Sequence, residues 1–269
     1  RMVMAGDEFM GKEPLGNVYF TGIVRDKLRR QMSKTLGNSP DPLKLIEDYG
    51  ADAVRLGMLL CSSAGNDILF DISQVEQGRN FANKICNAYR LVKGWEAESS
   101  KEQPEHSRLA VEWFANKLNK TIEQMDDHCS KFRLSDSLMC IYKFFWDDFC
   151  AWYLEIVKPA YGEKMDMQTY KATLGFFDAL LKMLHPYMPF ITEELWHALE
   201  ERKEGETIML QALPEAKPWS LKVEEAFDTA ASAIMNIRSI RQSKGISPKE
   251  PLQLLAKAPF EPLMAPVIR

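Results

Sequence analysis

Apolar residues recur along most of this chain at steps of three and four, which is the spacing of one face of an α-helix. One such stripe runs over residues 73–95, and others follow over 109–125, 138–156 and 169–184. A further helix is expected to begin at Pro189, because proline is common at the first helical position. The stripe over 138–156 is apolar over a wide arc, which predicts a central helix. Five helices joined by short connections predict a helical bundle.

The residues before this bundle have a mixed pattern. The β-branched and aromatic residues of 17–24 predict a strand, and a basic loop follows at 25–34. Asp41 is placed to cap a helix over 42–49, and a second helix is expected over 51–60. This mixture of a strand and short helices predicts the end of an α/β domain.

The pattern changes again after residue 204. A short strand is expected at 207–210, a helix at 223–244 that Gly245 ends, and another strand at 252–255. A strand, a helix and a strand predict a small α/β appendage on the bundle. The domains that we expect are 1–71, 72–204 and 205–269.

Composition adds a soluble, globular character to this picture. Of 269 residues, 46% are hydrophobic and 27% are charged, which excludes disordered and collagen-like classes. No run approaches the roughly 18 apolar residues of a membrane helix, and no secretory signal is visible. We therefore expect no membrane association and a cytoplasmic location. The five cysteines form no Cys-x-x-Cys pair and the four histidines are scattered, so no metal site is expected.

Local charge points to a phosphate more clearly than the net charge of −4 does. Residues 25–34 hold five cations and one anion, a local net charge of +4. A lysine beside hydroxyl residues, in a loop that contains Gly37 and Asn38, suits a phosphate whose charge changes during a reaction. The alternative is a solvated basic loop without a ligand.

The segment Gln31-Met32-Ser33-Lys34-Thr35 resembles the Lys-Met-Ser-Lys-Ser signature of class I aminoacyl-tRNA synthetases. The resemblance implies that all five residues contact ATP and that Lys34 stabilises the ATP phosphates and the leaving pyrophosphate. Gln31 and Thr35 depart from the signature. Neighbouring Arg30 can supply the charge that Gln31 lacks.

Further segments resemble the valyl branch of that family. Residues 49–55 are similar to the helix pair of the valine, isoleucine and leucine enzymes, and residues 189–196 to a bundle helix of the valine and isoleucine enzymes. Residues 65–71, 79–84 and 237–241 resemble the valine enzymes. The implied fold is mostly α: the end of a Rossmann-type catalytic domain, an anticodon-binding helical bundle and the small α/β appendage.

The resemblance also implies a reaction. Valine and ATP, with Mg²⁺, would form valyl-adenylate and pyrophosphate, and the valyl group would pass to tRNA(Val). The family's His-Ile-Gly-His-type motif and its editing domain are absent from these residues, and the first residue is Arg1. We therefore expect a C-terminal fragment that is not active alone. The alternatives are an isoleucyl or leucyl enzyme, a non-catalytic tRNA-binding module, and a purely structural helical domain.

The helix expected over 73–95 carries a polar face opposite its apolar stripe. Asparagine is an unfavourable residue inside a helix, so three of them on one side favour a ligand for the amides. Contact with tRNA is one hypothesis. The other is that some amides bridge helix ends or the junction with the catalytic segment, with Asn83 buried there. The candidate tRNA-binding residues are Arg79, Asn80, Asn83, Lys84, Asn87 and Arg90.

Overall fold

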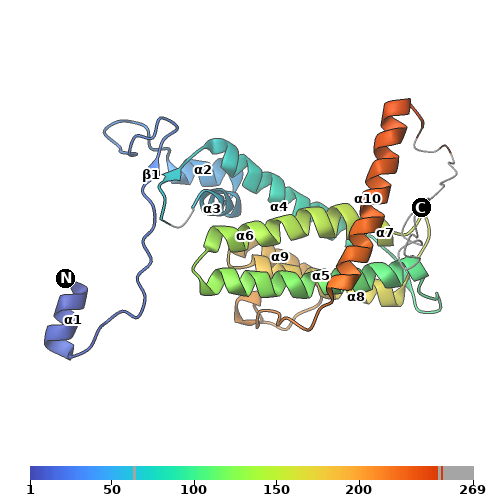
Figure 1. The fold of residues 1–269 in the computed structure, drawn as a ribbon. Helices are drawn as coiled ribbons and strands as arrows, with labels where there is room; N and C mark the ends of the chain where they lie inside the picture. The colour runs from blue at the N-terminus through green and yellow to red at the C-terminus, as the bar shows by residue number, and fades with distance from the viewer. Residues whose placement is uncertain (63–64, 248–249, 251–269) are drawn as a thin grey trace.

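The computed structural model describes residues 1–62, 65–247 and 250, and most of that length is helical (Figure 1). The N-terminal helix lies apart from the other elements, at the end of an extended segment. The two-residue strands that follow pair in parallel, with Val24 opposite Ile68 and Arg25 opposite Leu69. The N-terminal elements are α1 (Met2–Met10), β1 (Val24–Arg25), α2 (Pro42–Tyr49), α3 (Ala51–Leu60) and β2 (Ile68–Leu69).

The strand predicted at 17–24 is wrong except for its last residue. Strand β2 is only two residues long, so it pairs with Val24 and Arg25 and leaves the residues before them without a ladder partner among the described strands. The two predicted helices are confirmed at α2 and α3. Asp41 caps α2 by accepting a hydrogen bond from the backbone N–H of Leu43 at 3.0 Å, a contact worth about 1 kcal/mol.

The predicted helical bundle is confirmed. Helix α4 begins one residue after Asp71, whose side chain accepts from the backbone N–H of Ser73. A continuous helical stretch follows α5 and contains a π-helical segment, η1, in its middle. Strands β3 and β4 form a second parallel pair at one end of the bundle. The bundle elements are α4 (Ile72–Lys93), β3 (Ala97–Glu98), α5 (Glu105–Ser130), α6 (Leu134–Lys143), η1 (Phe144–Tyr153), α7 (Leu154–Val157), β4 (Met165–Asp166), α8 (Met167–Leu184) and α9 (Pro189–Leu199).

Aromatic residues fill the bundle core. Phe114 of α5 packs between Phe144 and Tyr153 of η1, with each pair of ring centroids 4.8 Å apart. Phe149 of the same segment meets Phe177 of α8 edge to face. These side chains are almost fully buried, and each contributes on the order of 2–3 kcal/mol of hydrophobic stabilisation. The central helix that the sequence predicts is therefore the one that carries this aromatic cluster.

Helix α3 joins the N-terminal segment to the bundle at close range. A Cβ atom on Gly78 of α4 would lie 2.4 Å from the backbone oxygen of Ala53, so only glycine allows this approach. Asp52 accepts hydrogen bonds from the backbone N–H groups of Phe190 and Ile191, at 3.3 and 2.7 Å, and so caps α9 from another element. Burial raises the pKa of Asp52.

Arg55, one turn further along α3, donates to the backbone oxygens of Pro186 and Tyr187 at 3.1 and 3.3 Å. Together with the Asp52 cap, these bonds fix the loop before α9 to α3. The N-terminal segment is thus held to the bundle by hydrogen bonds as well as by close packing.

The C-terminal part differs from its prediction. Residues Ile208–Leu210 form a 3₁₀ turn, η2, in place of the predicted strand, because Glu193 of α9 accepts from the Thr207 hydroxyl and from the Ile208 backbone N–H. Helix α10 (Leu221–Lys244) ends at Gly245, as predicted, and its C-terminal half extends beyond the bundle (Figure 1). The strand predicted at 252–255 lies outside the described residues. Among the described residues, no helix is long and apolar enough to cross a membrane.

Candidate functional site

The basic loop at 25–34 folds back on itself beside β1 (Figure 1). Arg25 and Gln31 form an antiparallel bridge, and the backbone N–H of Met32 donates to the backbone oxygen of Val24 at 3.3 Å. Between these contacts Arg29 adopts a left-handed conformation with φ of 62°. The Lys-Met-Ser-Lys-Ser-like segment, residues 31–35, therefore begins where this tight backbone loop closes.

Most of the positive charge of this loop is paired within the protein. Arg25 pairs with Asp67, and Lys27 pairs with Asp71 at 3.0 Å. The hydrogen bond from Arg25 lowers the pKa of Asp67. Two carboxylates about forty positions further along the chain thus balance half of the local charge of +4 that the sequence shows.

Arg30 pairs with Asp26 at 2.7 Å. The expectation that Arg30 supplies the charge missing at Gln31 is therefore not supported, because its guanidinium is engaged within the loop. Arg29 and Lys34 are exposed, and neither forms an ion pair with another described residue. These two cations are the ones left to meet an anion.

Lys34 is the first residue of a second, smaller turn over residues 34–37. The backbone N–H of Gly37 donates to the backbone oxygen of Lys34 at 3.2 Å, and that of Leu36 donates to the Ser33 hydroxyl at the same distance. Gly37 has a φ of 63°, which a glycine adopts without strain. Gln31, Lys34 and Thr35 are exposed, and Ser33 is half-buried.

Met32 ties this loop to the protein. Its half-buried side chain packs against the small hydrophobic cluster of Leu45, Ala53, Phe70 and Val75. A cavity of about 330 Å³ lies beside it, lined also by Asp26, Asn38 and Phe70. Of the five residues that the resemblance assigns to ATP, one anchors the loop and three are exposed on it.

The candidate tRNA-binding residues of α4 fall into two groups. Arg79 donates to the backbone oxygen of Asp48 at 3.3 Å and lies over the Tyr49 ring, and Lys84 lies over the Trp146 ring at 5.5 Å. These two cations therefore contact neighbouring elements. The other four are exposed, and none has a side-chain hydrogen bond or ion pair with another described residue: Asn80, Asn83, Asn87 and Arg90.

Of the two hypotheses for this face, the one that places Asn83 buried at the junction with the catalytic segment is wrong, because Asn83 is exposed. Helix α4 turns its apolar residues, among them Val75, Ile85 and Val92, to the core, and the asparagines lie on the opposite side. Arg79 of the same helix forms a hydrogen bond to α2. Unpaired amides on an exposed helix face remain available to a ligand.

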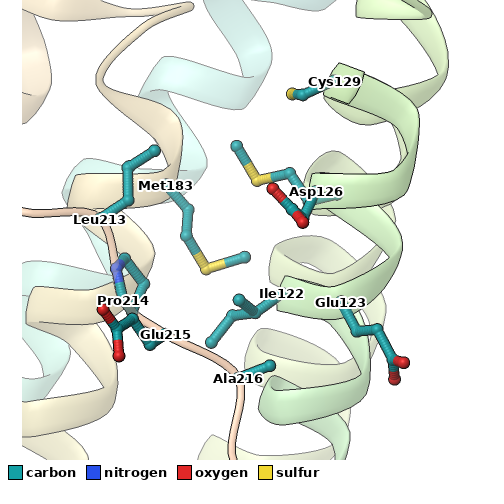
Figure 2. Close-up of a pocket in the computed structure, with 10 residues that line it drawn as sticks. Ile122, Glu123, Asp126, Cys129, Met183, Leu213, Pro214, Glu215 and Ala216 are labelled. Carbon is teal, nitrogen blue, oxygen red and sulfur yellow. The ribbon is translucent and has the colours of Figure 1, made fainter. Parts of the chain in front are cut away.

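A separate pocket of about 390 Å³ lies between α5, α8 and residues 213–216 (Figure 2). Its walls are mainly apolar, with Ile122 and Met183 on facing sides. Its charged lining residues, Glu123, Asp126 and Glu215, are all acidic. Such a lining repels phosphate, so this pocket does not suit ATP or a tRNA backbone.

The sequence does not predict the acidic partners of the loop, nor the hydrogen bonds that Asp52 of α3 accepts from α9. Asp67 and Asp71 come into reach of Arg25 and Lys27 only because β1 and β2 pair in parallel, and nothing in the local sequence reveals that pairing. Asp52 was missed for the same reason, since its partners are about 140 positions away. The described residues contain no group of three or more His, Cys, Asp or Glu side chains that could hold a metal ion.

Comparisons with known proteins define the class. Residues 111–256 match the family model for the anticodon-binding domain of tRNA ligase, and residues 1–71 match the model for class I tRNA synthetases of the I, L, M and V group. The first match covers more than half of the chain, and the chain therefore belongs to the class I tRNA ligases.

Within that class the chain is similar to several valine–tRNA ligases, in agreement with the sequence motifs. It is 58% identical over 254 residues to the valine–tRNA ligase of Parabacteroides distasonis, which covers 94% of this chain and 29% of that protein. It is 58% identical over 256 residues to the valine–tRNA ligase of Porphyromonas gingivalis, with 95% and 29% covered. The valine–tRNA ligase of Bacteroides fragilis is 56% identical over 272 residues, with 100% and 31% covered. The chain thus spans less than a third of the length of these relatives.

A solved structure supports the fold. The LeuRS of Agrobacterium radiobacter K84, determined as a ternary complex with tRNA and LeuAMS, matches with a TM-score of 0.59 and 21% identity. The match covers 80% of this chain and 26% of that one. At this identity the likeness concerns the arrangement of the helices alone, and it agrees with the mostly α fold that the sequence predicts.

Proposed function

We propose that this chain is the part of a valine–tRNA ligase that supplies the ATP-phosphate loop and the tRNA-binding bundle. The ligase would activate valine with ATP and transfer it to tRNA(Val) in the cytoplasm. One observation carries the proposal: Lys34 is exposed and, with Arg29, has no ion-pair partner among the described residues, while Arg25, Lys27 and Arg30 are paired. In a valine–tRNA ligase, this lysine of the signature is the one that meets phosphate.

The loop fits ATP in charge and in shape. An unpaired ammonium on a flexible stem can follow the phosphates as charge shifts to the leaving pyrophosphate. Ser33 and Thr35 flank it with hydroxyl groups, and the cavity beside Met32 lies at the base of the same loop. Mg²⁺ would come with the ATP phosphates. The protein's contribution here is to place Lys34, and the exposed position of Gln31 leaves room for a contact with the nucleotide.

The bundle fits a tRNA through the exposed face of α4. Three asparagines and Arg90, whose side chains have no partner in the described part of the chain, offer amides to base edges or sugars and a cation to phosphate. Arg79 and Lys84 add positive charge at the same helix face, although both also contact neighbouring elements. The family match to an anticodon-binding domain covers residues 111–256, which begin after α4, and it supports the anticodon stem and loop as the part of the tRNA that the bundle meets.

Pyrophosphate exchange tests the proposal in the enzyme made from the complete reading frame. Valine should support exchange, and isoleucine and leucine should not; exchange with either of those instead would select the alternative enzymes. Lys34→Ala should lower kcat for exchange by about 100-fold, because it removes a charge that stabilises the transition state. Lys44→Ala removes an exposed lysine of the neighbouring helix α2 and should change kcat by less than about 2-fold. Equal activity of the two variants would refute the role of Lys34.

A further inference from the structure

The carboxylate of Asp26 is the centre of the hydrogen bonds that hold the loop. Its Oδ1 accepts from the backbone N–H groups of Leu28 and Arg30, at 3.0 and 2.9 Å. Its Oδ2 accepts from Arg30 Nε at 2.8 Å and from Asn38 Nδ2 at 3.0 Å. The side chain is only 13% exposed, although it lies in a surface loop. The hydrogen bonds from Asn38 and Arg30 hold the pKa of Asp26 well below its usual range.

Asn38 links Asp26 to the segment that contains Lys34 through hydrogen bonds of its side-chain amide. Its Nδ2 also donates to the backbone oxygen of Gln31 at 3.3 Å, and its Oδ1 accepts from the backbone N–H of Ser33 at 2.9 Å. One amide therefore joins the residue after β1 to both sides of Met32. Lys34 follows Ser33 directly, and it lies between Ser33 and Asn38, which the hydrogen bond from the Ser33 N–H to Asn38 Oδ1 joins.

Hydrophobic burial does little of this positioning. Leu28 and Leu36, the two leucines of the loop, are 72% and 63% exposed. Met32 alone packs against the hydrophobic cluster beneath. The direction of the loop beyond Met32 therefore depends on the polar contacts of Asp26 and Asn38.

We propose that Asp26 and Asn38 are positioning residues for Lys34, which fix the 33–38 loop so that the lysine ammonium meets the ATP phosphates. This inference rests on the proposed role of Lys34. A point charge acts through its distance from the developing charge, and a displacement of about 1 Å at an active site can cost on the order of 100-fold in rate. Asp26 and Asn38 touch no substrate in this account and act through the backbone of the loop.

A double-mutant cycle tests this inference in the enzyme made from the complete reading frame. Asp26→Asn, Lys34→Ala and the double variant are compared by valine-dependent pyrophosphate exchange, with kcat and the KM for ATP measured separately. Asp26→Asn should lower kcat/KM by about 10- to 100-fold when Lys34 is present. It should lower kcat/KM by less than about 2-fold further when Lys34 is already alanine, because residues that act as a unit are not additive.

Three controls separate positioning from loss of structure. Glu47→Gln removes an exposed carboxylate of α2 and should leave exchange unchanged within about 2-fold. The affinity of each variant for tRNA(Val) should also stay within about 2-fold, since the bundle is untouched. If Asp26→Asn does not fold, as judged by circular dichroism, Asn38→Ala takes its place in the cycle with the same expected factors.

The outcomes are distinct. The same loss from Asp26→Asn in both Lys34 backgrounds, or no loss in either, would overturn the positioning role while leaving the proposed function intact. Full activity of Lys34→Ala would overturn both, because the proposed role of the lysine itself would then be wrong.

Discussion

Asp148 offers a stability prediction with a defined sign and size. It lies in the π-helical segment η1, with its side chain 23% exposed and its carboxylate 3.7 Å from Lys117 Nζ. Burial, together with the nearby charges of Asp147 and Asp228, raises its pKa from 3.8 to about 6 in spite of Lys117. The folded protein therefore holds the protonated form of Asp148 more tightly than the unfolded chain does.

The sign of the effect follows from this difference. Between about pH 4 and pH 6 the folded state binds more protons at Asp148 than the unfolded state, so its contribution to stability is present at low pH and is lost as the pH rises. The difference between the pKa values of Asp148 in the folded and unfolded states corresponds to about 3 kcal/mol in the free energy of unfolding. Asparagine has nearly the shape of the protonated carboxyl group and carries no charge. Asp148→Asn should therefore raise the free energy of unfolding by about 2–3 kcal/mol near pH 8 and by almost nothing near pH 4.

Urea denaturation of the chain, followed by circular dichroism at several pH values, measures both numbers. Glu76→Gln is the control, because Glu76 is exposed on α4 and forms no ion pair with another described residue. Its effect should stay within about 0.5 kcal/mol at each pH. A destabilising effect of Asp148→Asn near pH 8, or a gain of equal size at both ends of the pH range, would refute the reasoning.

Two further predictions concern the junction between the N-terminal segment and the bundle. Gly78→Ala should destabilise the chain by about 1–3 kcal/mol, because the new Cβ would meet the backbone of Ala53. Gly175→Ala, in open space on α8, is the control and should stabilise the chain by up to about 1 kcal/mol. Equal melting temperatures of the two variants would contradict the close approach of α3 and α4. Asp52→Ala should cost about 1–2 kcal/mol in urea denaturation, because the N–H groups of Phe190 and Ile191 lose their acceptor. A change below about 0.5 kcal/mol would show that Asp52 does not brace α9.

The sequence predicts those parts of the fold that local physics determines. Asp41 marks the start of α2 and Gly245 marks the end of α10, because caps depend on neighbouring residues. The strand predicted at 207–210 is wrong, since Glu193 of α9 takes the Ile208 N–H and the Thr207 hydroxyl, a contact that no local pattern reveals.

The candidate site divides in the same way. Lys34 and its neighbours are visible in the sequence as a basic, glycine-containing loop. The carboxylates that neutralise Arg25 and Lys27 lie on either side of β2, at Asp67 and Asp71, so the sequence overstates the free charge of the loop. Whether each asparagine on α4 is exposed or packed against another element could be learned only from the structure. Helical periodicity gives the face on which a residue lies and not the elements that pack against that face.

The most direct test of the account is the binding of this chain to tRNA(Val) on filters, at low and moderate salt. The account predicts affinity that falls with salt and that weakens by about 10-fold or more when the anticodon is changed, a loss of about 1.4 kcal/mol. The double variant Asn83→Ala, Asn87→Ala should weaken binding to a similar degree, and Gln168→Ala, an exposed amide on α8, should not. Equal affinity for both tRNAs, or for the double variant and the control, would contradict the claim that this bundle reads the anticodon through α4.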